Sequence, residues 1–215
     1  MKLAIAGAEL EPSEVVYDGW IHAFGSYIPK RCVTEHQDSP WSQAVILAKR
    51  RCEGVCQIFG RLIARHLKCL LNGGGQWTVT HVPAEPNNQE WLCDGLDRCA
   101  TEMLATCICH ELSREINISH ESILIQVRPK ARKQHQCTDI VERVSNVQGL
   151  YGLAPGAQVN GRMMLLVDDV ITSGATMHEC SRVLKEVGGA AEVIGVALAR
   201  TVRLRDEQLK LGFSL

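Results

Sequence analysis

Two adjacent carboxylates, Asp168 and Asp169, stand directly after an unbroken apolar run at residues 163–167. Such a run is typical of a strand buried on both faces of a parallel sheet. A turn rich in hydroxyls and glycine follows at residues 172–175, and a helix is predicted from about Thr176. Ligands of open α/β sheets bind outside the carboxyl ends of strands, and a helix N-terminus attracts anions. We therefore expect a phosphate at the turn, beside aspartates that hold sugar hydroxyls or a Mg²⁺-bound ligand.

An ordinary strand–turn–helix unit with a solvated acidic pair is the alternative interpretation of this segment. Neighbouring carboxylates repel each other unless a ligand or cation lies beside them, which favours a binding site. Thr172, Ser173 and Thr176 add hydroxyl donors, and Gly174 lets the backbone approach a ligand closely.

The segment resembles the phosphoribosyl-pyrophosphate (PRPP) loop of type I phosphoribosyltransferases. That loop has an apolar strand, two acidic residues, two apolar residues and then Thr/Ser-Thr/Ser-Gly-x-Thr, and residues 163–176 conform throughout. The resemblance implies an α/β fold, with an open and mainly parallel sheet flanked by helices and a small N-terminal hood. It also implies transfer of ribose-5-phosphate from PRPP to a nitrogenous acceptor, with release of pyrophosphate.

The resemblance also assigns roles to residues. Asp168 and Asp169 become the catalytic residues, which hold the ribose hydroxyls and Mg²⁺ carried by PRPP. The residues that bind the 5′-phosphate become Thr172, Ser173, Gly174, Ala175 and Thr176. The residues that neutralise departing pyrophosphate become Arg128, Lys130 and Arg132, although a solvated basic loop explains these cations equally well.

Within the family, the chain is most similar to the ComF branch, over about residues 42–203. The branch has an Arg-rich loop and an Arg-x-x-Asn-x-x-Gly pattern, here Arg143 to Gly149. Its four zinc-binding cysteines in Cys-x-x-Cys pairs are absent from this sequence. The loop that grips pyrophosphate in the family also differs here, at residues 81–86. It lacks a cation, and Glu85 and the later Asp94 add negative charges that should weaken binding of a polyanion. PRPP binding therefore follows from the resemblance better than turnover does.

Three other functions fit parts of the sequence. A PRPP or nucleotide sensor, or a ComF-type accessory protein of DNA uptake (competence), would keep the loop without turnover. A Walker B strand would need an upstream Gly-x-x-x-x-Gly-Lys-Ser/Thr, which the sequence lacks. A nucleic-acid-binding module is disfavoured by the net charge of −1 and by the lack of aromatic residues among the cations of 128–133.

Composition sets wider bounds. The 215 residues are 46% hydrophobic, which is ample for the core of one α/β domain. No apolar run reaches the ~20 residues that span a bilayer, so we expect no membrane association and a cytoplasmic protein. The family often forms homodimers, and the acceptor lies beyond what the sequence predicts.

The ten cysteines are expected to be reduced and mostly buried, because many lie within helical patterns where Cys acts as a small apolar residue. A zinc site made of Cys52, Cys56 and a histidine such as His66 is the alternative. His66 lies on the apolar stripe of a helix, where a core histidine is the expected role.

The elements that position the site follow from periodicity. We expect an N-terminal hood or extension at 1–41, a core at 42–205 and a tail at 206–215. Two helices are predicted between residues 42 and 71, broken near 49–54, and a third ends near residue 111. Core strands are predicted at 77–82, 123–127 and 193–199 around the apolar run, and Gly188-Gly189 ends the helix that follows it. The alternation of strands and helices predicts a parallel sheet with right-handed crossovers.

Overall fold

The protein is represented by a computed structural model that describes residues 3–5, 8–10, 16–30, 32–71, 75–84, 99–129 and 140–202. For residues 3–18 and for residue 140 only the backbone is described. The strands are β1 (Leu3–Ile5), β2 (Ala8–Leu10), β3 (Val16–Asp18), β4 (Ile21–Ala23), β5 (Ser26–Tyr27), β6 (Trp77–His81), β7 (Ile118–His120), β8 (Leu124–Gln126), β9 (Tyr151–Leu153), β10 (Met163–Ile171) and β11 (Glu192–Thr201). The helices are α1 (Val33–Gln37), α2 (Pro40–Lys49), α3 (Glu53–Leu71), α4 (Ala100–Leu112), α5 (Ile140–Val147) and α6 (Ala175–Arg182), which a π-helical turn, η3 (Val183–Val187), continues.

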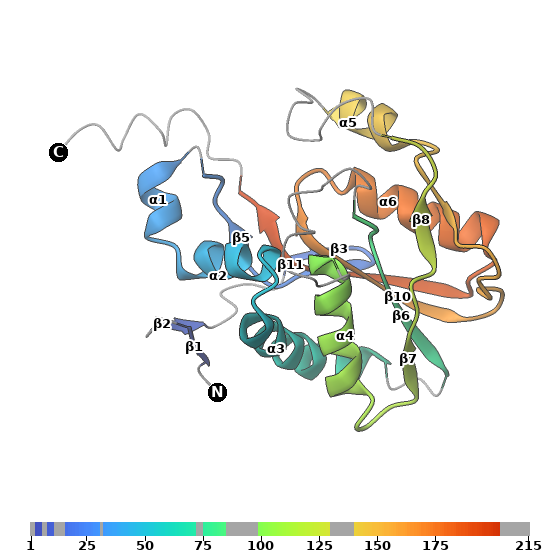
Figure 1. Cartoon of the computed structure of the whole chain (residues 1–215), viewed down its shortest axis with the longest axis horizontal. Helices are drawn as coiled ribbons and strands as arrows, with labels where there is room; N and C mark the ends of the chain where they lie inside the picture. Colours follow the sequence, from blue (N-terminus) through green and yellow to red (C-terminus); the bar gives the residue numbers. More distant parts are fainter. Residues whose placement is uncertain are drawn as a thin grey trace.

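A mainly parallel sheet forms the centre of the molecule (Figure 1), in the order β3-β4-β11-β10-β6-β7, with β5 also paired to β11. Only the β3–β4 pair is antiparallel among the described strands of this sheet. The predicted fold class, an open and mainly parallel sheet flanked by helices, is confirmed. β4 and β5 both pair with β11, and β3 lies outside β4. The predicted division of the chain at residue 41 stays a prediction.

The direction in which successive strands are added to the sheet reverses at its middle. From β6 the chain passes through α4 to β7 on one side, whereas from β10 it passes through α6 to β11 on the other. β6 follows β10 only as far as the pair Val167–His81, while β11 follows it to the pair Ile171–Arg200. The carboxyl end of β10 therefore lies at a topological switch point, where open α/β sheets bind ligands.

Helices cover both faces of the sheet because the central strands are apolar on both sides. Leu165 and Val167 of β10 pack in a core with α2, α3 and α4. Met164 and Leu166 pack in a second core with α6. All four side chains are fully buried, as expected for a central parallel strand.

One predicted core strand is in the wrong place. The segment at 123–127 was expected in the main sheet, but β8 pairs antiparallel with β9 in a separate two-stranded sheet. The strand beside β6 is instead β7, at Ile118–His120. In the described part of the chain, no helix is long and apolar enough to cross a bilayer.

Candidate functional site

The turn between β10 and α6 leaves the start of a helix without a side-chain cap. Gly174 is the N-cap residue of α6, and its backbone φ of 78° lies in the left-handed region that favours glycine. No side chain caps the helix there, and the amide of Ala175 donates only a long hydrogen bond to Ser173 Oγ, at 3.4 Å. Uncapped amides at a helix N-terminus attract anions, so this turn suits a phosphate group.

A hollow of about 70 Å³ opens over this turn. It is lined by Arg143, Asp168, Val170, Ile171, Thr172, Ser173, Gly174, Ala175, Thr176 and Met177. The residues predicted to bind phosphate thus lie together with one of the predicted aspartates. Their role in binding stays a prediction.

The two adjacent aspartates lie in different surroundings. Asp168 lines the hollow, and its Oδ1 accepts a hydrogen bond from the amide of Asp169 at 2.8 Å. Asp169 Oδ1 accepts from the amide of Val170 at 2.5 Å, and its Oδ2 lies 3.1 Å from Lys49 Nζ. Local hydrogen bonds of this kind hold both carboxylates close to the backbone at the point where β6 no longer follows β10.

Lys49 supplies the positive charge beside the acidic pair. It is the last residue of α2, and its side chain is 36% exposed. Burial disfavours its charge, but attraction and a hydrogen bond to Asp169, with the charge of Asp168, outweigh burial and raise the pKa of Lys49. Burial raises the pKa of Tyr27 as well, with Lys49 opposing and Asp169 reinforcing the shift. These directions indicate one electrostatic cluster that joins α2, β5 and the end of β10.

Sequence comparison points to phosphoribosyltransferases. The orotate phosphoribosyltransferase of Xylella fastidiosa (strain M12) is 33% identical over 97 residues, which cover 45% of this chain and 36% of the relative. That of Halorhodospira halophila (strain DSM 244 / SL1) is 41% identical over 56 residues, which cover 26% of each chain. The chain therefore spans well under two thirds of the length of the curated relatives it matches. No protein-family profile matches it.

Solved structures with a similar arrangement include a hypoxanthine phosphoribosyltransferase from Staphylococcus aureus. It is 8% identical, with a TM-score of 0.44 over 70% of this chain and 74% of that one. A hypoxanthine phosphoribosyltransferase from Trypanosoma cruzi is 11% identical, with a TM-score of 0.41 over 69% of this chain and 65% of that one. Scores at this level support no further conclusion about the chain. The curated relatives are orotate enzymes, and membership of the ComF branch stays a prediction.

Two predicted residues have partners that limit what they offer a ligand. Thr172 Oγ1 lies 2.9 Å from Thr201 Oγ1 on β11, so this hydroxyl is already engaged. Arg128 donates to the carbonyls of Gln148 at 2.6 Å and Gly149 at 3.3 Å, and does not line the hollow. Lys130 and Arg132 lie outside the described residues. The predicted pyrophosphate role of these three cations stays a prediction.

Two cations, Lys49 and Arg143, were assigned no role at the site from the sequence. The structure brings Lys49 to Asp169 and Arg143 to the hollow. For Arg143 a signal existed, since it opens the Arg-x-x-Asn-x-x-Gly pattern.

Proposed function

We propose that this chain is a phosphoribosyltransferase of the type I fold, which binds PRPP together with Mg²⁺. It transfers ribose-5-phosphate to a nitrogenous acceptor and releases pyrophosphate. The observation that carries the proposal is the uncapped start of α6 at Gly174, which borders one hollow together with Asp168. The names of the matched relatives support the same activity.

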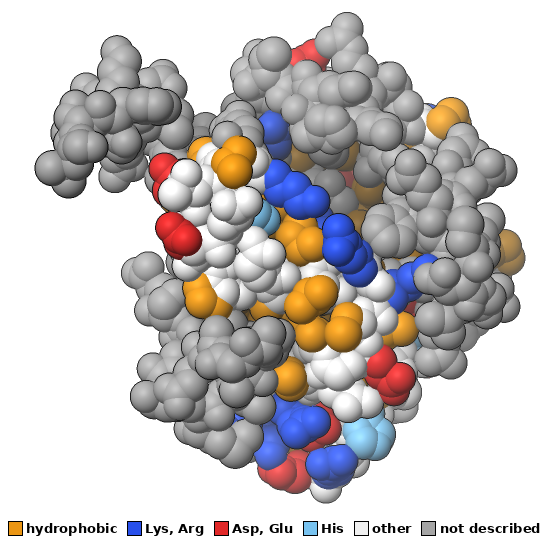
Figure 2. All heavy atoms as spheres, turned by 60° about the vertical axis from the view of Figure 1, so that its left-hand side comes forward, with side chains coloured by type: hydrophobic (Ala, Val, Ile, Leu, Met, Phe, Trp, Pro, Cys, Tyr) orange, Lys and Arg blue, Asp and Glu red, His pale blue; other side chains and the backbone are white. Residues whose placement is uncertain are grey.

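Positive charge gathers on one face of the molecule. Figure 2 shows the molecule from the side of α1 and α2, and Lys and Arg side chains form a diagonal band across the middle of that face. Arg143 adds a positive charge in the hollow itself. A band of one sign raises the local concentration of ligands of the opposite sign, although the chain as a whole carries a net charge of −1.

The proposed reaction breaks the bond between C1 of PRPP and a pyrophosphate oxygen, and the bonding electrons leave with pyrophosphate. The acceptor nitrogen forms the new bond to C1 and loses a proton. Positive charge develops on the ribose ring, and the carboxylate of Asp168 stabilises it while holding the ring hydroxyls. The turn at 172–176 fixes the 5′-phosphate. No protein nucleophile is required, because orientation of the two reactants supplies much of the rate.

The residues present fit Mg²⁺. This ion prefers carboxylate oxygens, phosphate oxygens and water, and Asp168 and Asp169 are both partly exposed. Asp168 lines the hollow, so it is the better placed of the two to face a Mg²⁺-bound ligand. When bound, Mg²⁺ would neutralise charge on the pyrophosphate as it leaves.

The test is calorimetry of PRPP in the presence of Mg²⁺. We expect Asp168→Asn to weaken binding at least about tenfold, because a charged hydrogen-bond acceptor for the ribose hydroxyls is lost. We expect a smaller loss for Asp169→Asn, which also removes the partner of Lys49. Asp38→Asn serves as the control, since Asp38 is exposed beside α1. Binding heats equal to wild type in both site variants would show that neither carboxylate takes part in PRPP binding.

A sensor that binds PRPP without turnover is the second candidate. Arg143 is the one cation among the described residues that line the hollow, which is little charge to hold departing pyrophosphate. Release of labelled pyrophosphate from PRPP, measured against a panel of bases and amines, separates the two functions. Binding without release with every acceptor would favour the sensor.

A further inference from the structure

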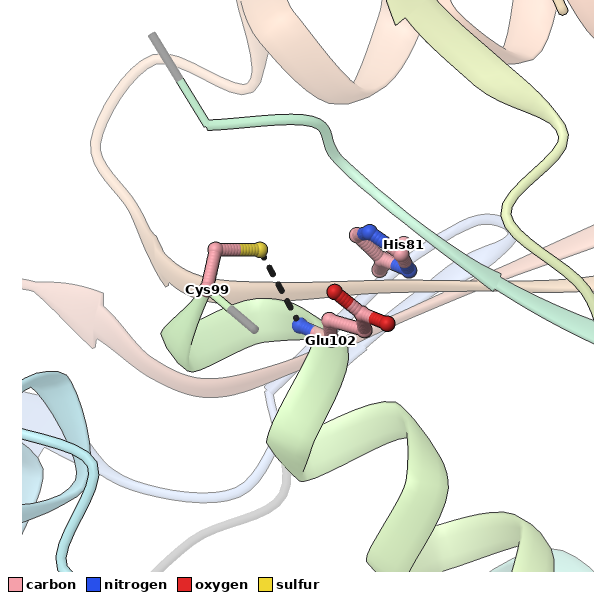
Figure 3. A group of neighbouring side chains, drawn as sticks. All are labelled: His81, Cys99 and Glu102. Carbon is pink, nitrogen blue, oxygen red and sulfur yellow. Dashed lines mark hydrogen bonds between the residues drawn. The ribbon is translucent and has the colours of Figure 1, made fainter. Parts of the chain in front are cut away.

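Three side chains with metal-binding atoms converge one strand away from the acidic pair. His81 ends β6, Cys99 is the N-cap residue of α4, and Glu102 lies in the first turn of that helix. One ligand atom from each lies within 4.8 Å of the other two. Figure 3 shows the Cys99 thiol and the Glu102 carboxylate beside the His81 ring, at the place where the strand and the helix meet.

The imidazole of His81 is sheltered and oriented. The residue is 6% exposed, and its Nδ1 lies 3.5 Å from Nε2 of His120 on the neighbouring strand. The two rings stack with an interplanar angle of 28°. In metal sites, a neighbour on one ring nitrogen of a histidine orients the other nitrogen toward the ion.

The position of Cys99 is unusual for a purely structural residue. Its sulfur accepts a long hydrogen bond from the amide of Glu102, at 3.4 Å, and lies 3.1 Å from Thr101 Oγ1. The Thr101 hydroxyl donates to the carbonyl of Val82, which fixes the start of α4 to the end of β6. Ser, Thr, Asp and Asn are the preferred N-cap residues, so a cap alone does not call for cysteine. The positive end of the helix also favours an anionic sulfur and carboxylate.

We propose that His81, Cys99 and Glu102 form a binding site for a zinc-class divalent transition-metal ion. A nitrogen, a sulfur and an oxygen donor suit Zn²⁺, whereas Mg²⁺ prefers oxygen donors alone. Three protein ligands leave a fourth position for water or for a ligand. The ion would tie the end of β6 to the start of α4. His81 pairs in register with Val167, directly before Asp168, so the ion lies at the same edge of the sheet as the proposed PRPP site but on different residues.

Cobalt spectroscopy tests the proposal, because a thiolate bound to Co²⁺ gives a charge-transfer absorption that oxygen and nitrogen ligands do not give. The purified chain is stripped with a chelator and titrated with Co²⁺, and Zn²⁺ is then used to displace it. We expect one equivalent to bind with the thiolate absorption. We expect Cys99→Ser to abolish that absorption and to weaken binding at least about tenfold. Serine keeps the N-cap hydrogen bond, so α4 is retained.

Matched variants make the result decisive. Cys107→Ser changes a partly buried thiol on the same helix and should leave the absorption unchanged. Cys52→Ser tests the alternative zinc site with Cys56 and His66. Thermal unfolding should show that Zn²⁺ raises the melting temperature of the wild type but not of Cys99→Ser. The proposal is overturned if wild type shows no thiolate absorption, if Cys99→Ser keeps it, or if Cys52→Ser loses it. None of these readouts requires PRPP, so they stand apart from the test of the proposed function.

Discussion

At the scale of single residues, the acidic pair is asymmetric. Sequence reasoning treated Asp168 and Asp169 as equivalent, because both follow the same strand. The structure separates them, with Asp168 on the hollow and Asp169 on Lys49. The residues next to the two aspartates in sequence do not predict this difference, since Lys49 belongs to a helix far earlier in the chain.

The pairing of Lys49 with Asp169 leads to a prediction about Mg²⁺. In Lys49→Met the ammonium no longer neutralises Asp169, so the acidic pair attracts a cation more strongly. A partly exposed ion pair contributes up to about 1 kcal/mol, which corresponds to about a fivefold lower Mg²⁺ concentration for half-maximal PRPP binding. Titration of Mg²⁺ at a fixed PRPP concentration measures this midpoint. Lys68→Met is the control, since Lys68 pairs with Glu115 away from the hollow. A midpoint that is unchanged or higher would contradict the prediction.

Gly174 is predicted to be needed for its backbone conformation. A Cβ there would lie 3.4 Å from the ring of His178, which is an ordinary contact, so the cost of Gly174→Ala is the left-handed φ of 78°. That strain costs about 1–2 kcal/mol of unfolding free energy. Relaxing it would move the first amides of α6 and weaken PRPP binding as well.

Gly156→Ala is the matched control for this prediction. Gly156 has a φ of 80° with no atom near the added Cβ, and it does not line the hollow. We expect both variants to lose similar stability in urea unfolding, and only Gly174→Ala to lose affinity in calorimetry. Equal affinities in the two variants would show that the turn at Gly174 does not hold the phosphate.

At the scale of elements, long and regular sequence patterns predicted strands and helices correctly, whereas the pairing of short strands was not predicted. The apolar run, the turn and the glycine stop at 188–189 correctly predicted β10, α6 and the end of the helical segment at Val187. The strand predicted at 123–127 was misplaced because apolar content alone does not say which strand a segment pairs with. β7 has one apolar residue, Ile118, and its pairing with β6 depends on how α4 returns the chain to the sheet.

The contact that holds α6 against the end of α5 is predicted to depend on pH. Glu179 is 7% exposed, accepts from the amide of Gly149 at 2.8 Å and binds Arg182 through both carboxylate oxygens at 2.8 and 2.9 Å. The hydrogen bond to Arg182, against the opposing effect of burial, lowers the pKa of Glu179. Because Arg143 reaches the hollow from α5, this contact also supports the site.

We expect Glu179→Gln to lower the unfolding free energy by about 2 kcal/mol at pH 7, since hydrogen bonds to a charged group are lost. A carboxyl with a lowered folded-state pKa stabilises the fold above its unfolded-state pKa of about 4.5, and this stability is lost as pH falls through the folded value. The difference between wild type and variant in urea unfolding should therefore narrow below pH 4.5. Glu186→Gln, at an exposed partner of Arg182, should show little effect at any pH. A difference that widens in acid would contradict this account.

At the scale of the whole molecule, the position of the candidate site could be predicted, but the charged residues that surround it could not. The order of strands and helices predicts a parallel sheet, and a site at the carboxyl end of its central strand follows from that. The cluster of His81, Cys99 and Glu102 had no sequence signal, because its residues lie on two elements and match no spaced metal motif. Contacts that form only when distant elements pack together cannot be predicted from the periodicity and spacing of residues in the sequence.

The packing of the whole chain also predicts which thiols react. Cys56, in the first turn of α3, is fully buried, and burial, with nearby Cys107, Cys52 and Glu53, raises its pKa to about 12. Since the thiolate is the reactive form, Cys56 should be alkylated only when the chain unfolds. Cys52 and Cys69 are exposed and should react first. Iodoacetamide labelling followed by peptide mass spectrometry measures each rate. Rates at Cys56 should rise with urea in step with global unfolding, while those at Cys52 change little. Labelling of Cys56 in native buffer as fast as Cys52 would mean that α3 opens locally, without unfolding of the sheet beneath it.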